Sequence, residues 1–177
     1  MNWLLGRAAT MCKRYEADFG YAAVRYGEFR KSMDTVRFRE AGQADAGAIT
    51  TCIAAAYAEA RESIPDLPDV TAGIEEEIEV SQVVLAETGH GLAGVIVFAR
   101  RGDAMKIVNL AVSPDAQGQG IAGRLMARAE EEARASGCTR MELRTHRLME
   151  GTRAMYTHLG WRETETSGNT VSMMKAL

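Results

Sequence analysis

Cysteine and histidine are scarce in this sequence, with three residues of each among 177. The cysteines, Cys12, Cys52 and Cys138, are far apart and odd in number, and no two of them form a C-x-x-C pair. This pattern is typical of reduced thiols rather than of a disulfide framework or a zinc site. We therefore expect a chain that holds no metal and works in a reducing compartment, with the cytoplasm as its location.

Long apolar runs and an excess of basic charge are absent as well. No stretch approaches the roughly 20 apolar residues of a membrane span, and Trp3-Leu4-Leu5 is too short for the core of a signal peptide. The formal net charge is -3, whereas nucleic-acid-binding domains usually carry a basic footprint. We expect neither a membrane nor a nucleic acid as a partner.

The remaining composition is that of an ordinary globular domain, with 46% hydrophobic and 25% charged residues. Residues 1–34 mix aromatic and basic residues without clear turn signals. We predict an N-terminal extension of uncertain structure there. From residue 35 to residue 177 the apolar pattern becomes regular, and this length suits one α/β domain.

Apolar periodicity and turn residues predict an order of β-α-α-β-β-β-α-β-α-β-β for the domain. The first helix is expected to start at Asp45, whose side chain would cap it. The clearest helix covers 120–135, where Gly137 provides a left-handed stop. The other elements are strands at 35–39, 83–87, 92–99, 105–112, 141–145, 161–164 and 171–175, and helices at 74–78 and 152–159.

Residues 112–123 read V-S-P-D-A-Q-G-Q-G-I-A-G and join the fourth predicted strand to the clearest helix. The N–H groups at a helix start are unpaired and face the positive end of the helix dipole. Glycines ahead of that start let a phosphate approach the N–H groups closely. No Gly-Lys-Ser/Thr follows, so the stretch is not an ordinary P-loop. We expect it to bind a phosphate-bearing group.

A dinucleotide site is one alternative, because Gly118–Gly123 is a literal G-x-G-x-x-G and Glu142 lies about 20 residues on. In that fold, however, the strand runs almost directly into the first glycine, whereas residues 113–117 intervene here. Three antiparallel strands also precede the motif, and too little chain follows for a doubly wound sheet. A plain strand-to-helix turn remains open too.

Residues 110–122, L-A-V-S-P-D-A-Q-G-Q-G-I-A, resemble the acetyl-CoA signature of the GNAT acetyltransferase superfamily. Residues 155–161, M-Y-T-H-L-G-W, resemble the family's downstream L-Y-x-x-x-G-F motif. The resemblance covers 35–177. It implies an α/β fold with a mixed, mostly antiparallel central sheet flanked by helices, in which the fourth and fifth strands splay apart.

The resemblance also implies acetyl-CoA as co-substrate, without a metal. The pyrophosphate would lie on the amides of the glycine corner, and the pantetheine arm would bind along the fourth strand like an added strand. A backbone amide of that strand would polarise the thioester carbonyl. The positions expected to bind the cofactor are Leu110, Ala111, Val112, Gln117, Gly118, Gln119, Gly120, Ile121, Ala122 and Gly123.

For catalysis, the resemblance implies direct acetyl transfer to an amine, with Tyr156 as the acid that protonates the leaving thiolate. Many family members carry a glutamate base where this chain has Val108. His146 is the main substitute because imidazole titrates near neutral pH, while Glu87 and ordered water are further candidates. The family often has a cofactor-binding asparagine near the position of Met149.

The acceptor site is expected between the first two helices. Its candidate residues are Tyr57, Arg61 and the loop 64–69, while Arg144 and Arg147 could serve an anionic substrate or the 3′-phosphate. The acceptor is expected to be a small-molecule amine or a protein amine, and the family's habit of dimerising leaves a homodimer open. A non-catalytic acyl-CoA-binding or regulatory module on the same fold is the main alternative to an N-acetyltransferase.

Overall fold

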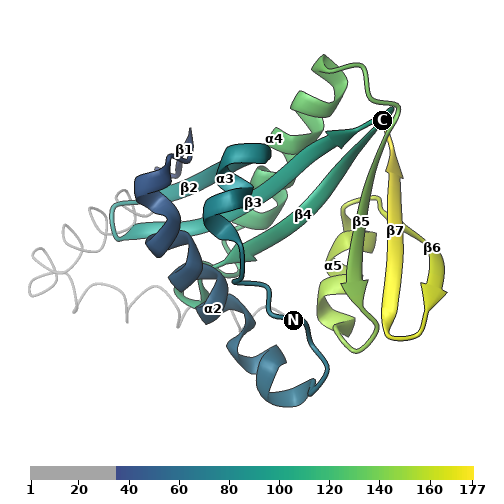
Figure 1. Cartoon of the computed structure of the whole chain (residues 1–177), viewed down its shortest axis with the longest axis horizontal. Helices are drawn as coiled ribbons and strands as arrows, with labels where there is room; N and C mark the ends of the chain where they lie inside the picture. The colour runs from purple at the N-terminus through teal and green to yellow at the C-terminus, as the bar shows by residue number, and fades with distance from the viewer. Residues whose placement is uncertain (1–34) are drawn as a thin grey trace, which may run out of the picture. The chain divides into compact units, whose positions relative to one another are not determined.

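A seven-stranded mixed sheet organises residues 35–177, which are the residues that the computed structural model describes (Figure 1). The predicted extension at 1–34 lies outside them. In the sheet the strand order is β1-β2-β3-β4-β5-β7-β6. The strands are β1 (Arg37–Glu40), β2 (Gln82–Thr88), β3 (Gly91–Arg101), β4 (Ala104–Val112), β5 (Arg140–His146), β6 (Arg162–Ser167) and β7 (Thr170–Ala176). The predicted order of elements and the mixed α/β class are confirmed.

The helices are α2 (Ala46–Ser63), α3 (Ile74–Val80), α4 (Ile121–Ala135) and α5 (Glu150–His158), with short 3-10 turns η1 (Gln43–Asp45) and η2 (Pro114–Ala116). Side chains of α2 and α3 form one hydrophobic cluster with one face of the sheet. Those of α4 and α5 form another with the opposite face. Among residues 35–177, no helix combines the length and the apolar character that a membrane span requires.

The apolar pattern of each strand matches its place in the sheet. In β3 the run Ala93–Ala99 is buried at every position, as expected for a central strand covered on both faces. Strand β6 is exposed throughout and lies at one edge of the sheet. The centre of the sheet therefore carries the core.

The capping role predicted for Asp45 is wrong. Its side chain makes no capping bond to α2. The carboxylate instead accepts the N–H of Gly42 at 2.8 Å and pairs with Arg39 at 2.8 Å. The chain enters α2 through η1, so Asp45 closes that turn and joins it to β1.

Strands β4 and β5 run parallel but pair over three residues only, from Ala104↔Arg140 to Lys106↔Glu142. Beyond these pairs the two strands diverge, as Figure 1 shows. A register shift against β3 makes Val108 an extra residue in β4, between Ile107 and Asn109. The expected splay of the fourth and fifth strands is confirmed, and it opens a gap along the carboxyl half of β4.

Candidate active site

Two cavities lie beside the splayed strands. The first, here called the corner cavity, has a volume of about 590 Å³ and is bordered by the glycine corner, β4, α4 and α5. The second, the loop cavity, has a volume of about 430 Å³ and is bordered by the loop after α2, β4, β5 and the β6–β7 turn. The residues that line both are Tyr57, Leu110, Met149, Thr152 and Tyr156. Molecules bound in the two cavities would therefore contact each other beside these shared residues.

The three glycines of the corner differ in backbone conformation. Gly118 and Gly120 adopt left-handed backbone conformations, with φ of +74° and +73°. Side chains other than glycine are strained in this region. Gly123 has an ordinary helical φ inside the first turn of α4, and a Cβ there would meet Leu159 at an unstrained 3.6 Å. The turn therefore requires glycine at 118 and 120 but not at 123.

The backbone N–H groups from Gly118 to Gly123 donate no hydrogen bond within residues 35–177. The first bond of α4 comes only at Arg124, whose N–H reaches the carbonyl of Gly120 at 3.1 Å. These N–H groups sit at the positive end of the helix dipole. With one exception, every predicted cofactor-binding residue lines the corner cavity. The exception is Gln119, whose side chain donates to the carbonyl of Asp115 at 3.3 Å.

The free edge of β4 supplies a second set of backbone groups. The N–H of Ser113 donates to Ala93 of β3 at 2.9 Å. Because the backbone direction alternates along a strand, the N–H and C=O of Ala111 also face β3, while those of Leu110 and Val112 face the gap. The prediction that this strand binds the pantetheine arm thus narrows to the backbone of Leu110 and Val112.

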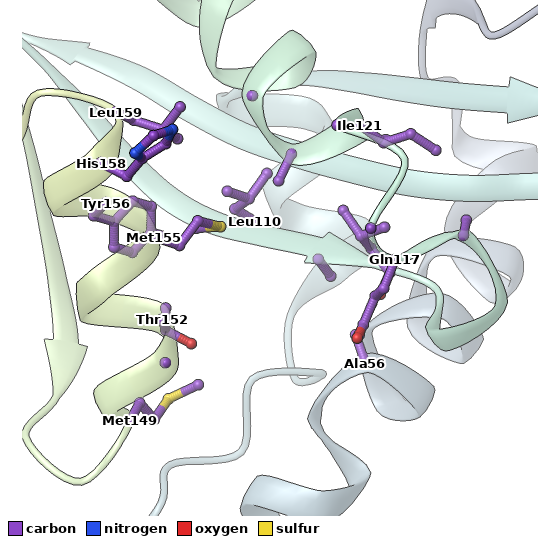
Figure 2. Close-up of a pocket in the computed structure, with 18 of the residues that line it drawn as sticks. Ala56, Leu110, Gln117, Ile121, Met149, Thr152, Met155, Tyr156, His158 and Leu159 are labelled. Atoms are coloured by element: carbon purple, nitrogen blue, oxygen red, sulfur yellow. The ribbon is translucent and has the colours of Figure 1, made fainter. Parts of the chain in front are cut away.

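One face of α5 forms the opposite wall. Figure 2 shows Met149, Thr152 and Met155 projecting from this helix toward the space that Leu110 borders. With Tyr156 and Leu159 they recur every three or four residues, as one helix face does. Sequence reasoning singled out Tyr156 and Met149 and missed the others, although this spacing was the signal that could have found them.

Tyr156 is buried and held by Trp161. The two rings lie 5.9 Å apart at 54°, and the N–H of Trp161 donates to the carbonyl of Tyr156 at 3.0 Å. Burial raises the pKa of the Tyr156 phenol well above its ordinary value, with a smaller contribution from Tyr57. Its hydroxyl has no partner within the described chain. It is therefore a neutral proton donor in the wall between the cavities.

His146 is buried at the end of β5 and lines the loop cavity. Its Nδ1 accepts the N–H of Leu148 at 3.3 Å, so in the neutral ring the proton sits on Nε2, 3.4 Å from an Asp66 carboxylate oxygen. Both ring nitrogens are thus engaged. This arrangement favours a positioning role for His146, whereas the general-base role stays a prediction.

Asp66 joins three segments of the loop cavity. Besides facing His146, it accepts a hydrogen bond from the side-chain amide of Asn169 in the β6–β7 turn. These bonds, that from Asn169 first, lower the pKa of the Asp66 carboxyl. Sequence reasoning missed the pairing of Asp66 with Asn169, because the two residues are 103 positions apart and neither lies in a motif.

Of the remaining candidate residues, some line the loop cavity and others line neither cavity. Val108 is 42% exposed and lines the loop cavity, and the amide of its neighbour Asn109 donates to the carbonyl of Val70 at 3.1 Å. Glu87 and Arg61 line neither cavity. The first binds Arg39 at 2.8 Å and the second faces Asp69 at 3.8 Å. Neither is placed to act on a substrate in these cavities.

Comparison with known proteins identifies similar chains. The model of the acetyltransferase (GNAT) family matches residues 51–161, and no curated protein sequence matches at a significant level. The PaiA N-acetyltransferase of Thermoplasma acidophilum, solved with coenzyme A, superposes with a TM-score of 0.73 at 16% identity, covering 81% of this chain and 99% of its own. A Bacillus subtilis acetyltransferase, also solved with coenzyme A, superposes with a TM-score of 0.63 at 21% identity, covering 81% of this chain and 99% of its own. The ribosomal-protein-S18-alanine N-acetyltransferase of Escherichia coli superposes with a TM-score of 0.66 at 18% identity, covering 80% of this chain and 94% of its own.

Proposed function

The chain belongs to the acetyltransferase (GNAT) family, and we propose that it transfers the acetyl group of acetyl-CoA directly to the nitrogen of an amine. The observation that carries this proposal is the run of unpartnered N–H groups from Gly118 to Gly123, on the wall of a cavity that shares Tyr156 with a second cavity. The coenzyme A in the structures from T. acidophilum and B. subtilis supports the same cofactor here.

The corner cavity fits the parts of acetyl-CoA. The N–H groups of Gly118 to Gly123 would hold the pyrophosphate, because they combine free donors with the positive end of the α4 dipole. The gap-facing backbone of Leu110 and Val112 would hold the pantetheine arm in the manner of a strand partner. When bound, acetyl-CoA supplies an acetyl group activated as a thioester.

Tyr156 would donate a proton to the departing sulfur. Its raised pKa keeps the phenol protonated at any physiological pH, and its hydroxyl has no competing partner in the described chain. Packing against Trp161 holds the ring in the wall that both cavities share. The phenol is therefore protonated before the substrates arrive, as a general acid must be.

The attacking amine must lose a proton, since an alkyl ammonium has a pKa near 10.4. Among the described residues that line the loop cavity, Asp66 has a lowered pKa and is a weak base, and His146 has both nitrogens engaged. We infer that the proton leaves through water in the loop cavity. With a histidine base the rate would instead stop rising near neutral pH. The pH profile therefore distinguishes proton loss through water from proton transfer to a histidine.

Two measurements on the full chain test the proposal. Calorimetry should detect binding of acetyl-CoA and of coenzyme A, but not of NADH or NADPH. Release of the coenzyme A thiol should then depend on an added amine, across a panel of amino acids, polyamines and peptides. Failure to bind any coenzyme A species would exclude the proposal, and binding without turnover on any amine would favour the non-catalytic module.

A further inference from the structure

The loop cavity has a cationic side chain without a partner. Arg144 lies in β5 and lines this cavity. Within the described part of the chain its guanidinium makes no hydrogen bond and no ion pair. Burial alternates along β5, with Met141 and Leu143 packed in the core. Arg144 therefore points to the opposite face of β5, where its side chain is exposed and borders the loop cavity.

The anionic groups around Arg144 are already engaged. On the same face of β5, Glu142 accepts a hydrogen bond from Arg140 at 2.7 Å. Asp66, in the loop over this cavity, is held by Asn169 and faces His146. On β7 the residue paired with Arg144 is Ser172, which carries no charge. Arg144 therefore lines the cavity with no ion pair of its own, and the Asp66 carboxylate lines the same cavity on different partners.

The position of Arg144 along the strands places it near the expected transfer point. The last β4–β5 pair is Lys106↔Glu142, and Val108 is the extra residue of β4. Two residues beyond that pair, where the strands have diverged, Arg144 lines the loop cavity together with Asn109 and Leu110. Because the backbone of Leu110 faces the gap, an acceptor held in this cavity would meet both Arg144 and the expected transfer point.

We propose that the acceptor is a small amine that also carries a carboxylate, as an amino acid does, and that Arg144 binds this carboxylate. The planar guanidinium matches the two oxygens of a carboxylate with paired hydrogen bonds. The cavity that Arg144 and Leu110 line has a volume of about 430 Å³, which favours a small acceptor with its carboxylate only a few bonds from the amine. This inference rests on the proposed function and gives its substrate class.

The test uses matched sets of three acceptors: an amino acid, its carboxamide, and the amine left by removing the carboxylate. Phenylalanine, phenylalaninamide and phenethylamine form one set, and leucine, leucinamide and isoamylamine another. Rates are compared per unprotonated amine, because the three members differ in amine pKa. We expect the wild-type chain to prefer the amino acid by roughly 10-fold or more in kcat/KM, as a charge-assisted contact allows.

In Arg144→Gln the kcat/KM for the amino acid should fall roughly 10- to 100-fold, while that for the other two members stays within about 2-fold. In Arg144→Lys the kcat/KM for the amino acid should fall less, since lysine keeps the positive charge but lacks the planar guanidinium that makes two parallel hydrogen bonds. Arg162→Gln is the matched control, because Arg162 is exposed on β6 and lines neither cavity. It should leave all three rates unchanged.

Two results would overturn the inference while the proposed function stands: equal wild-type rates on amino acids and carboxamides, or an equal loss on all three members in Arg144→Gln. If no amine is acetylated, the proposed function fails at transfer, yet the carboxylate site is still testable. Calorimetry of amino acids against the chain saturated with coenzyme A should then detect binding that Arg144→Gln abolishes. Absence of that binding would contradict the inference by itself.

Discussion

The two cavities that share Tyr156 are built from different parts of the chain. The corner cavity presents backbone N–H groups from one continuous stretch, Gly118 to Gly123, and from the adjoining strand β4. The loop cavity presents side chains from distant segments, among them Asp66, Arg144 and Asn169. A backbone site depends on conformation and tolerates many side chains, whereas a side-chain site changes its ligand with a single substitution. The first suits a constant cofactor and the second a specific acceptor.

The largest effect should come from breaking the backbone conformation of the corner. In Gly118→Val/Gly120→Val the left-handed residues carry branched side chains, each strained by roughly 1–2 kcal/mol or more. We expect the turn to rearrange and the Kd for acetyl-CoA to rise roughly 100-fold, since several charge-assisted hydrogen bonds are lost. Calorimetry measures the change. Gly123→Ala is the control and should bind within about 3-fold of wild type, as its Cβ meets only an ordinary contact.

Removing the shared hydroxyl should have the next largest effect. Tyr156→Phe keeps the ring packing against Trp161 and loses a group that has no partner in the described chain. We expect kcat to fall roughly 100-fold, the scale of acid–base catalysis, with the Kd for acetyl-CoA unchanged. Steady-state kinetics and calorimetry together check this. An unaltered kcat would remove Tyr156 from the mechanism.

Adding a base to the loop cavity should raise activity, whereas the two changes above lower it. Without a protein base, kcat/KM should rise tenfold per pH unit until the acceptor amine is unprotonated. Val108 is exposed at the bulge, so Val108→Glu introduces a carboxylate there with little cost in packing. We expect a roughly 10-fold gain in kcat/KM at pH 7 and a flatter pH profile. Val108→Gln has the same size without a base and should show neither change. A wild-type profile that is already flat at neutral pH would instead support His146 as base.

The smallest effect should come from loosening the acceptor loop. Asp66→Asn removes the charge that Asn169 and His146 bind, and we expect a roughly 3- to 5-fold rise in the acceptor KM. The KM for acetyl-CoA should not change. Asp69→Asn, in the same loop but outside both cavities, is the control.

The bonds that Asn169 and His146 make to Asp66 depend on pH through the lowered pKa of the Asp66 carboxyl. Its folded pKa lies below the ordinary carboxyl value of about 3.9, so these bonds are complete above that value and are lost as the pH falls through the lowered pKa. Ionisation of the Asp66 carboxyl itself should therefore contribute nothing to the pH profile between pH 6 and 9. The difference in acceptor KM between wild type and Asp66→Asn should persist down to about pH 4, and a difference already absent at pH 5 would contradict the assignment.

Much of the corner cavity could be predicted because its information is local. The glycines between a strand and a helix predict the exposed helix start, and the structure adds that Gly118 and Gly120 are left-handed. The direction of the backbone groups could not be predicted, since whether Ala111 faces β3 or the gap depends on register with another strand. The capping prediction for Asp45 failed for a similar reason, because Arg39 of β1 binds its carboxylate.

The sequence by itself determined the order of elements, the glycine corner with its exposed helix start and the place of Tyr156, because each depends on residues within one turn or one strand-helix junction. Only the tertiary structure decided which side chains line the loop cavity. The gap between β4 and β5 brings Asp66, Arg144 and Asn169 to one cavity across more than a hundred residues of chain. It also decided that Glu87 and Arg61 lie outside both cavities, because each faces an oppositely charged side chain of a neighbouring segment.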